Sequence, residues 1–207
     1  MLKKLEKLQY TGVNIMDILQ KAASGDMAAF ETLIVQYEKL IYNIAWRIMG
    51  NAEDAKDIAQ EAIIKIYRNL AACKSLDLFK AWAAKITHNT CMDELRRRKN
   101  KATESYDAML EEGRADADIR GVELGSSVSD SPEAALMQKE LQGIIADGLS
   151  QLSDEHRALL VLRDVQGISY EEIADITNLP LGTVKSRISR GRSNLKRILL
   201  NMMEHNP

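Results

Sequence analysis

Basic and hydroxyl side chains gather in one short segment near the C-terminus, and their types suit contact with nucleic acid. Six basic residues and no acidic residue lie between positions 183 and 197. Arginine and lysine can read guanine and neutralise phosphate, and serine or threonine can donate to either. With Val184, Ile188 and Leu195 facing inward at helical spacing, the outer face carries Thr183, Lys185, Ser186, Arg187, Ser189, Arg190 and Arg192.

The residues before this segment predict the elements that would hold such a helix in place. Ser169 and Glu172 have the spacing of a capping box. Ile168 and Ile173 stand where a hydrophobic staple would. A short helix to about 177, a turn through Pro180 and a last helix to about 202 predict a helix-turn-helix, whose second helix enters the major groove of DNA. A solvated basic face on an ordinary helical hairpin is the alternative.

A helix expected over 53–70 surrounds one exposed isoleucine with charge. Asp57 and Glu61 lie one helical turn apart, and Ile64 lies one turn further along the same face. Asp54 and Arg68 extend the charged outer side. An apolar anchor ringed by charge is typical of a protein interface. Ordinary helix solvation and a carboxylate metal site are the alternatives, and the metal site lacks the histidines that di-iron helices use.

No group of residues predicts catalysis or a bound cofactor. His88 and Cys91 share a helix face but lack two further ligands, so we do not expect zinc. We find neither a phosphate-binding glycine loop nor a nucleophile with a base and an orienting group. The expectation is therefore a protein with no catalytic residue, no metal ligand and no cofactor.

The net charge of −2 over 207 residues hides a strong segregation of charge. Lys85–Lys101 holds six basic and two acidic residues, whereas 102–133 holds nine acidic residues and two arginines. Such blocks indicate interaction surfaces, although each could be a solvated helix face. Two cysteines are too few for a disulfide scaffold, and no apolar run approaches the roughly 18 residues of a membrane span. We expect a cytoplasmic protein with no membrane insertion.

Helical periodicity dominates the chain, and strand-like alternation is missing, so the predicted fold class is all-α. Glycine, serine and aspartate interrupt the periodicity near the middle of the chain, which predicts a linker between two small helical domains. The predicted organisation is an N-terminal extension (1–13), a first helical domain (14–101), an acidic linker (102–131) and a second domain with the helix-turn-helix (132–207).

Two blocks of this sequence resemble the extracytoplasmic-function sigma factors of bacterial RNA polymerase, in the right order and with compatible spacing. Asn51–Glu61 and Lys65–Leu70 are similar to the family's polymerase-binding helix, and Asp93–Arg97 matches its next helix. Leu162–Ala174 and Pro180–Arg187 resemble its C-terminal domain closely. The resemblance implies a bundle like sigma region 2 followed by a helix-turn-helix like sigma region 4.

The resemblance also implies a function, that of a non-catalytic subunit that locates promoters for core RNA polymerase and helps to open them. The surface for a basic coiled coil of the core would comprise Asp54, Asp57, Gln60, Glu61, Ile64 and Arg68. Single-stranded bases and phosphates at the minus-ten element would meet Lys74, Ser75, Lys85, Asn89, Arg96, Arg97 and Arg98. Duplex DNA at the minus-thirty-five element would meet Thr183, Lys185, Ser186, Arg187, Ser189 and Arg190. Family members are commonly held inactive by an anti-sigma factor, which is a further expected partner.

Some positions depart from the family pattern. Cys73 stands where the base-capture loop usually has phenylalanine, and Ser189 replaces a side chain that is often larger. Two other functions stay open on the residues alone. A stand-alone helix-turn-helix regulator would bind duplex DNA without polymerase, usually at a two-fold symmetric site. A helical metal-dependent hydrolase would need a set of ligands that the sequence does not offer.

Overall fold

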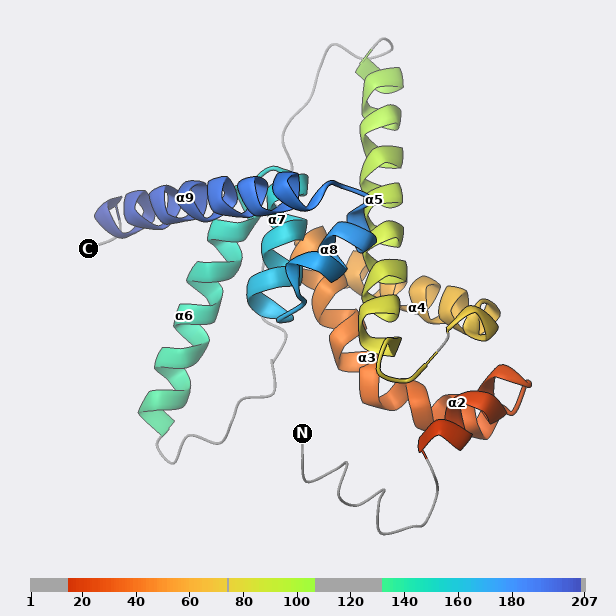
Figure 1. Cartoon of the computed structure of the whole chain (residues 1–207). Helices are drawn as coiled ribbons and strands as arrows, with labels where there is room; N and C mark the ends of the chain where they lie inside the picture. The colour runs from red at the N-terminus through yellow and green to blue at the C-terminus, as the bar shows by residue number, and fades with distance from the viewer. Residues whose placement is uncertain (1–14, 74, 107–131, 206–207) are drawn as a thin grey trace.

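The computed structural model describes residues 15–73, 75–106 and 132–205, and all regular structure in these ranges is helical (Figure 1). The first group of elements is α2 (Ile15–Ala23), α3 (Met27–Met49), α4 (Ala52–Arg68), the 3-10 turn η1 (Leu70–Ala72) and α5 (Phe79–Tyr106). The second group is α6 (Pro132–Ser150), α7 (Asp154–Leu160), the π-helical turn η2 (Val161–Val165), α8 (Tyr170–Thr177) and α9 (Leu181–His205). The predicted all-α class with two helical domains is confirmed.

Polar caps set the ends of the first long helices. The carboxylate of Asp26 accepts a hydrogen bond from the amide of Ala29 at 3.1 Å and so caps α3. Gly50 ends α3 with a φ of 83°, a left-handed conformation that glycine adopts without steric cost. Asn51 then caps α4 by accepting from the amide of Asp54 at 2.8 Å. Both ends follow from local chemistry, because aspartate is favoured just before a helix and glycine just after one.

Helix α5 extends further than the predicted first domain. It continues to Tyr106 and therefore passes the boundary that the sequence placed at 101. Figure 1 shows its C-terminal half extending beyond the rest of the molecule. Lysine, alanine and glutamate among the added residues are good helix formers. The remainder of the predicted linker and the predicted N-terminal extension lie outside the described residues.

The helix-turn-helix forms as predicted. The hydroxyl of Ser169 accepts from the amide of Glu172 at 3.1 Å, and the carboxylate of Glu172 accepts from the amide of Ser169 at 2.9 Å, which completes the capping box. Asn178 ends α8 in the left-handed region with a φ of 54°. A short turn then leads into α9, the long basic helix that Figure 1 shows extending away from the bundle.

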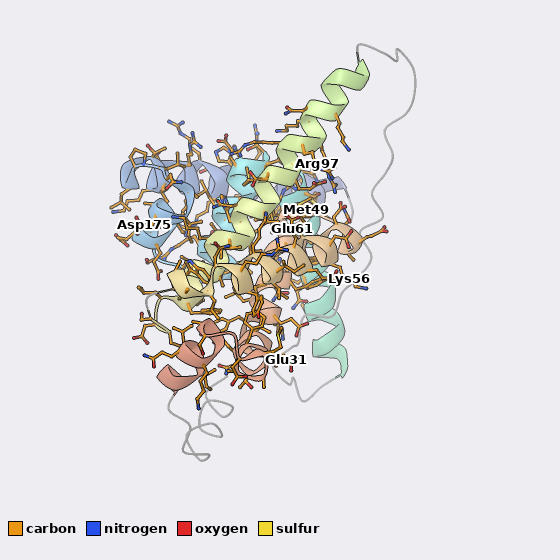
Figure 2. All side chains as sticks on the ribbon, turned by 90° about the vertical axis from the view of Figure 1, so that its right-hand side faces the viewer. Glu31, Met49, Lys56, Glu61, Arg97 and Asp175 are labelled. Carbon is orange, nitrogen blue, oxygen red and sulfur yellow. The ribbon has the colours of Figure 1, made fainter. Side chains whose placement is uncertain are left out.

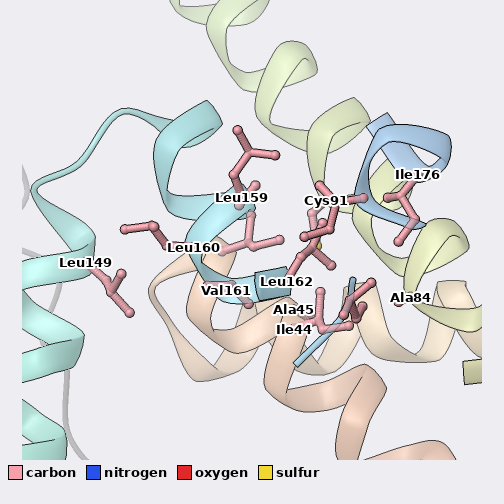
Figure 3. Packing of buried hydrophobic residues seen from close by; sticks show 14 of the residues in the cluster. Ile44, Ala45, Ala84, Cys91, Leu149, Leu159, Leu160, Val161, Leu162 and Ile176 are labelled. Carbon is pink, nitrogen blue, oxygen red and sulfur yellow. The ribbon is translucent and has the colours of Figure 1, made fainter. Parts of the chain in front are cut away.

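Two clusters of buried apolar side chains hold the helices together. The first lies among α2 to α5 and includes Phe30, Leu33, Ile41, Ile66 and Phe79. The second is shared by the two groups of helices (Figure 3). It joins Ile44 and Ala45 of α3 and Ala84 and Cys91 of α5 to Leu160, Leu162 and Ile176 of the second group. The two domains therefore bury a common core, with α8 against α5 and α7 against α3.

Candidate protein and nucleic-acid interfaces

The outer face of α4 stays open to solvent. Helical spacing turns Ala55, Ile58 and Ala62 into the two cores. Of the residues predicted to bind core polymerase, the structure leaves five exposed on this helix: Asp57, Gln60, Glu61, Ile64 and Arg68. Half of the surface of Ile64 is accessible. Figure 2 shows Glu61 on this helix, where it pairs with Lys65 one turn later at 2.7 Å.

Asp54 differs from the other predicted residues of this face because it has partners within the chain. Both of its carboxylate oxygens accept from the guanidinium of Arg98, at 2.5 and 2.6 Å, and Asn51 also donates to it. The hydrogen bonds from Arg98 lower the pKa of Asp54, and that from Asn51 lowers it further. The structure thus ties one predicted polymerase contact to one predicted phosphate contact.

The basic stretch of α5 carries its own counter-charges. Arg97 forms two hydrogen bonds of 2.7 Å with Glu94, and Arg98 forms a third of 2.8 Å. Arg96 pairs with Asp93 at 3.0 Å. Bonds from Arg97 and Arg98 lower the pKa of Glu94 to about 2. The three arginines remain exposed, so a phosphate can still approach them, but it must compete with these carboxylates.

The other residues predicted to capture the minus-ten strand lie at or before the middle of α5. Asn89 is exposed, and its side-chain oxygen lies 3.2 Å from Nδ1 of His88. The ammonium of Lys85 donates to the backbone carbonyl of Asp175 in the second domain, at 2.6 Å. Ser75 is half-buried at the loop before α5, and Lys74 lies outside the described residues.

Cys73, which replaces the family's usual phenylalanine, is buried in the first core. Its thiol donates to the carbonyl of Ser75 at 3.3 Å, and burial raises its pKa. Because the buried thiol donates to the backbone of its own loop, it stabilises the conformation of that loop. No aromatic ring stands at this position to stack on a base.

Helix α9 exposes most of its predicted contact residues on one side, as its helical spacing predicted. Val184 and Ile188 are buried, while Lys185, Ser186, Ser189 and Arg190 are exposed together on the outer side. Thr183 and Arg187 are half-buried. Arg187 donates to the carboxylate of Glu155 at the start of α7, at 2.7 Å. Four of the six predicted residues are therefore accessible to a partner, and Arg187 is held against α7 by Glu155.

Sequence reasoning missed the contacts of Arg157 and the ion pair of Arg192, which it had placed on the outer face of the last helix. Arg157, only 9% exposed, donates to the carbonyls of Leu149, Ser150 and Leu152 within its domain and of Ile48 in the first domain, at 2.7 to 3.0 Å. A lone arginine beside the apolar run 158–162 was the signal that could have revealed it. Arg192 binds Asp164 at 2.5 Å, which fixes α9 against the end of η2.

Metal clusters and membrane-spanning helices are both missing from the described ranges. Within those residues no group of three or more histidine, cysteine, aspartate or glutamate side chains is arranged to hold a metal ion. In the same part of the chain, no helix has the length and apolar character that crossing a membrane requires.

Comparison with known proteins identifies the family. Residues 33–101 match the model of sigma-70 region 2, and residues 142–195 match that of sigma-70 region 4. The RNA polymerase sigma-H factor of Pseudomonas aeruginosa is 33% identical over 186 residues, which is 88% of this chain and 92% of that protein. The ECF RNA polymerase sigma factor SigW of Bacillus subtilis is 33% identical over 190 residues, 89% of this chain and 96% of its own.

A solved structure agrees with these matches. The sigma factor RpoE of Bartonella quintana, determined in complex with the anti-sigma factor NepR, superimposes with a TM-score of 0.63 and 25% identity. The match covers 82% of this chain and 96% of that one. Order of domains, helix-turn-helix geometry and relatives over most of the length lead to one conclusion: this chain belongs to the extracytoplasmic-function sigma factors of bacterial RNA polymerase.

Proposed function

We propose that this sigma factor divides its work among three surfaces, each centred on a different helix. The outer face of α4 docks on core polymerase, the middle of α5 receives the opened minus-ten strand, and the outer face of α9 reads the minus-thirty-five duplex. The observation that supports this division is the separate exposure of an acidic, isoleucine-centred face on α4 and a basic face on α9. Because core polymerase works in the cytoplasm, we place the protein there, in a role without catalysis.

The polymerase surface centres on Asp57, Glu61 and Ile64. Exposed carboxylates attract a basic partner and fix its orientation, while an apolar side chain at their centre supplies desolvated contact area. Asp54 is already bound by Arg98. We therefore place it at the margin of the contact rather than at its centre.

The two DNA surfaces differ in the form of DNA that they suit. Lys185, Ser186, Ser189 and Arg190 stand on one side of a helix, the geometry that reads base edges in a major groove. Lys85 and Asn89 lie on α5, the helix that follows the loop, where an unstacked base would gain hydrogen bonds and its phosphate a cation. Control by an anti-sigma factor is proposed by analogy with the relative solved in such a complex.

The experiment is transcription by purified bacterial core polymerase on sheared genomic DNA, with mapping of new RNA 5′ ends. Added protein should create starts that share two upstream boxes at a fixed separation. The variant Asp57→Arg/Glu61→Arg should lose these starts and its binding to core. Glu31→Arg/Glu38→Arg is the matched control, since both residues are exposed on a different helix, α3.

Two results would contradict the proposal. Undiminished core binding by Asp57→Arg/Glu61→Arg would place the polymerase surface elsewhere. Absence of new starts together with tight duplex binding by the protein alone would favour a stand-alone regulator.

A further inference from the structure

The three adjacent arginines of α5 lie on different sides of the helix. Successive residues of an α-helix are rotated by about 100°, so residues four or eleven positions apart share a face. Lys85, Asn89 and Arg96 are related by these spacings. Arg97 and Arg98 are rotated away from Lys85 by about 120° and 140°, in opposite directions. Of the arginines predicted to meet minus-ten phosphates, only Arg96 therefore shares the face of Lys85 and Asn89.

Contacts with α4 mark the opposite side of α5. Lys65 of α4 donates to the hydroxyl of Thr90 on α5 at 3.2 Å. Arg98 donates to both carboxylate oxygens of Asp54 on α4, at 2.5 and 2.6 Å. Thr90, Glu94 and Arg98 follow one another at spacings of four residues, and Glu94 accepts from Arg98 at 2.8 Å. Arg98 thus belongs to the side of α5 that packs against α4.

Electrostatics relate Arg97 to α4 and Arg96 to another side. Hydrogen bonds to Glu94 raise the pKa of Arg97, and the charge of Glu61 on α4 raises it as well. Figure 2 shows Arg97 and Glu61 on these neighbouring helices. Burial lowers the pKa of His88, and the charge of Arg96 lowers it further, so Arg96 lies toward His88. The basic stretch is therefore divided between two sides of the helix.

Arg98 is bound through all three of its side-chain nitrogen atoms. Nε donates to Glu94, and the two Nη atoms donate to Asp54. Asp54 accepts a further hydrogen bond from the side-chain amide of Asn51, whose oxygen caps α4 by accepting from the amide of Asp54 at 2.8 Å. These bonds link α5 through Asp54 to the first turn of α4, where the outer acidic face begins.

The outer face of α4 benefits from such a cation because its acidic residues follow one another at helical spacing. Asp54, Asp57 and Glu61 stand at positions i, i+3 and i+7. Like charges one turn apart repel and weaken a helix. A guanidinium bonded to Asp54 offsets one of these charges and leaves Asp57 and Glu61 exposed to a partner.

We propose that Arg98 is a positioning residue of the polymerase surface, which holds the first turn of α4 and its acidic face in the geometry that core polymerase meets. On α5 the minus-ten strand then meets only the opposite face, that of Lys85, Asn89 and Arg96. This inference rests on the proposed docking of α4 on core polymerase, and it moves Arg98 from the DNA surface to the support of the protein surface.

The arginines suit a test because, within the described residues, they form no hydrogen bond with the second domain. The lysines nearer the start of α5 do bind that domain: Lys80 donates to the carbonyl of Gln166 at 2.7 Å, and Lys85 donates to that of Asp175 at 2.6 Å. Each arginine is changed to glutamine in the full-length chain, which removes the same charge from the same turn of α5. Core binding is measured by fluorescence anisotropy with purified core polymerase.

Promoter opening is measured separately, with core in excess over its Kd, as 2-aminopurine fluorescence at the minus-ten box of a promoter mapped by the transcription experiment. Arg98→Gln should weaken core binding about threefold to tenfold and change opening by less than about twofold. Arg96→Gln should keep core binding and lower opening, and the salt dependence of its minus-ten binding should lose about one unit of slope. Arg97→Gln should leave opening within about twofold of the unchanged chain.

Exchange of the pair distinguishes positioning from direct contact. Asp54→Arg and Arg98→Asp should each weaken core binding, and Asp54→Arg/Arg98→Asp should recover to within about threefold of the unchanged chain, because the same pair forms in reverse. Arg98→Lys should be intermediate, since one ammonium cannot bind both oxygens as a guanidinium does. Far-UV circular dichroism establishes that each variant is folded before it is measured. If the exchanged variant binds core as weakly as Asp54→Arg, Asp54 contacts core itself and the positioning role is refuted.

Two further results would overturn the proposal: core binding unchanged in Arg98→Gln, or opening lowered by Arg98→Gln as much as by Arg96→Gln. Asp57→Arg/Glu61→Arg, measured beside them, tests the docking surface itself. Normal core binding by that variant would refute the proposed docking of α4. Its loss of binding together with normal binding of Arg98→Gln would refute only the role of Arg98.

Discussion

Asp54 and Arg98 lie 44 residues apart in sequence and are joined by two hydrogen bonds of 2.5 and 2.6 Å. The pair fastens the first turn of α4 to the C-terminal half of α5. Its charges belong to two surfaces that the sequence assigned to different partners, polymerase and DNA. A partner that binds the charge of either residue must compete with the other residue for it. The two surfaces are therefore coupled at this point.

Acid should weaken the fold by protonating Glu94 and Asp54, the carboxylates that accept hydrogen bonds from Arg97 and Arg98. Bonds from Arg97 and Arg98 lower the pKa of Glu94 to about 2, from an ordinary value of 4.5, and bonds from Arg98 lower the pKa of Asp54. Both carboxyls bind protons less tightly in the folded chain than in the unfolded one. Their stabilisation is therefore complete above about pH 4.5 and is lost as the pH falls toward 2.

Urea denaturation at a series of pH values between about 6 and 2.5 measures this loss as a fall in unfolding free energy. Glu94→Gln should flatten that fall, because the mutant has one fewer carboxyl to protonate. Glu31→Gln, at an exposed position of α3, is the control and should keep the wild-type slope. An unchanged slope in Glu94→Gln would show that other groups set the acid response.

Loss of Arg157 should destabilise the protein strongly. Its guanidinium caps the C-terminal turns of both α3 and α6, and Arg157→Ala would leave several carbonyls unsatisfied in a buried position. We expect a loss of about 3 kcal/mol in unfolding free energy by urea denaturation, with Arg157→Lys intermediate because one ammonium cannot reach every acceptor. Arg190→Ala, at an exposed site, should change it by less than about 0.5 kcal/mol. A similar small loss for Arg157→Ala would mean that water replaces the guanidinium.

The cap of α8 provides a prediction with an internal control. Ser169→Ala removes a side-chain acceptor from the amide of Glu172 and should cost about 1 kcal/mol of unfolding free energy. Ser153 occupies the same position before α7 but forms no capping bond there. Ser153→Ala should therefore cost much less. Equal changes in melting temperature for the two variants would show that the capping bond contributes little.

Two arginines of α9 should behave differently on DNA. Arg190 is exposed and forms no ion pair within the described residues, whereas Arg187 is held by Glu155. Arg190→Ala should weaken binding to the minus-thirty-five box by about 1–3 kcal/mol and relax preference at one base pair if it reads that base. Arg187→Ala should have the smaller effect. Binding titrations on boxes substituted one base at a time measure both, and an equal loss on every box would assign Arg190 to a phosphate.

Local features of this fold were readable from the sequence because they depend on neighbours along the chain. The capping box at Ser169, the stop at Gly50 and the buried positions Val184 and Ile188 follow from spacing and from backbone chemistry within a few residues. The exposed faces of α4 and α9 follow from the same helical period. The family resemblance then supplied the partners of those faces.

Contacts between distant residues were not readable in this way. Arg157 reaches Ile48 across 109 positions and Lys85 reaches Asp175 across 90, and no local pattern fixes which helix end a cation will meet. Asp54 looked like a member of an exposed face because its spacing is right, but its partner on α5 is set by how α4 and α5 pack. The shared core likewise depends on the arrangement of whole helices.

The acceptors between the domains have a genetic consequence. The oxygens of Gln166 and Asp175 belong to the main chain, so almost any substitution at these two positions leaves the acceptor in place. Mutations that weaken the contact between the domains should therefore fall at the donors or in the shared core, and a screen for loss of this contact would recover changes at Lys80 far more often than at Gln166. The contact is sensitive to substitution at its donors, Lys80, Lys85 and Arg157, and not at these two acceptors.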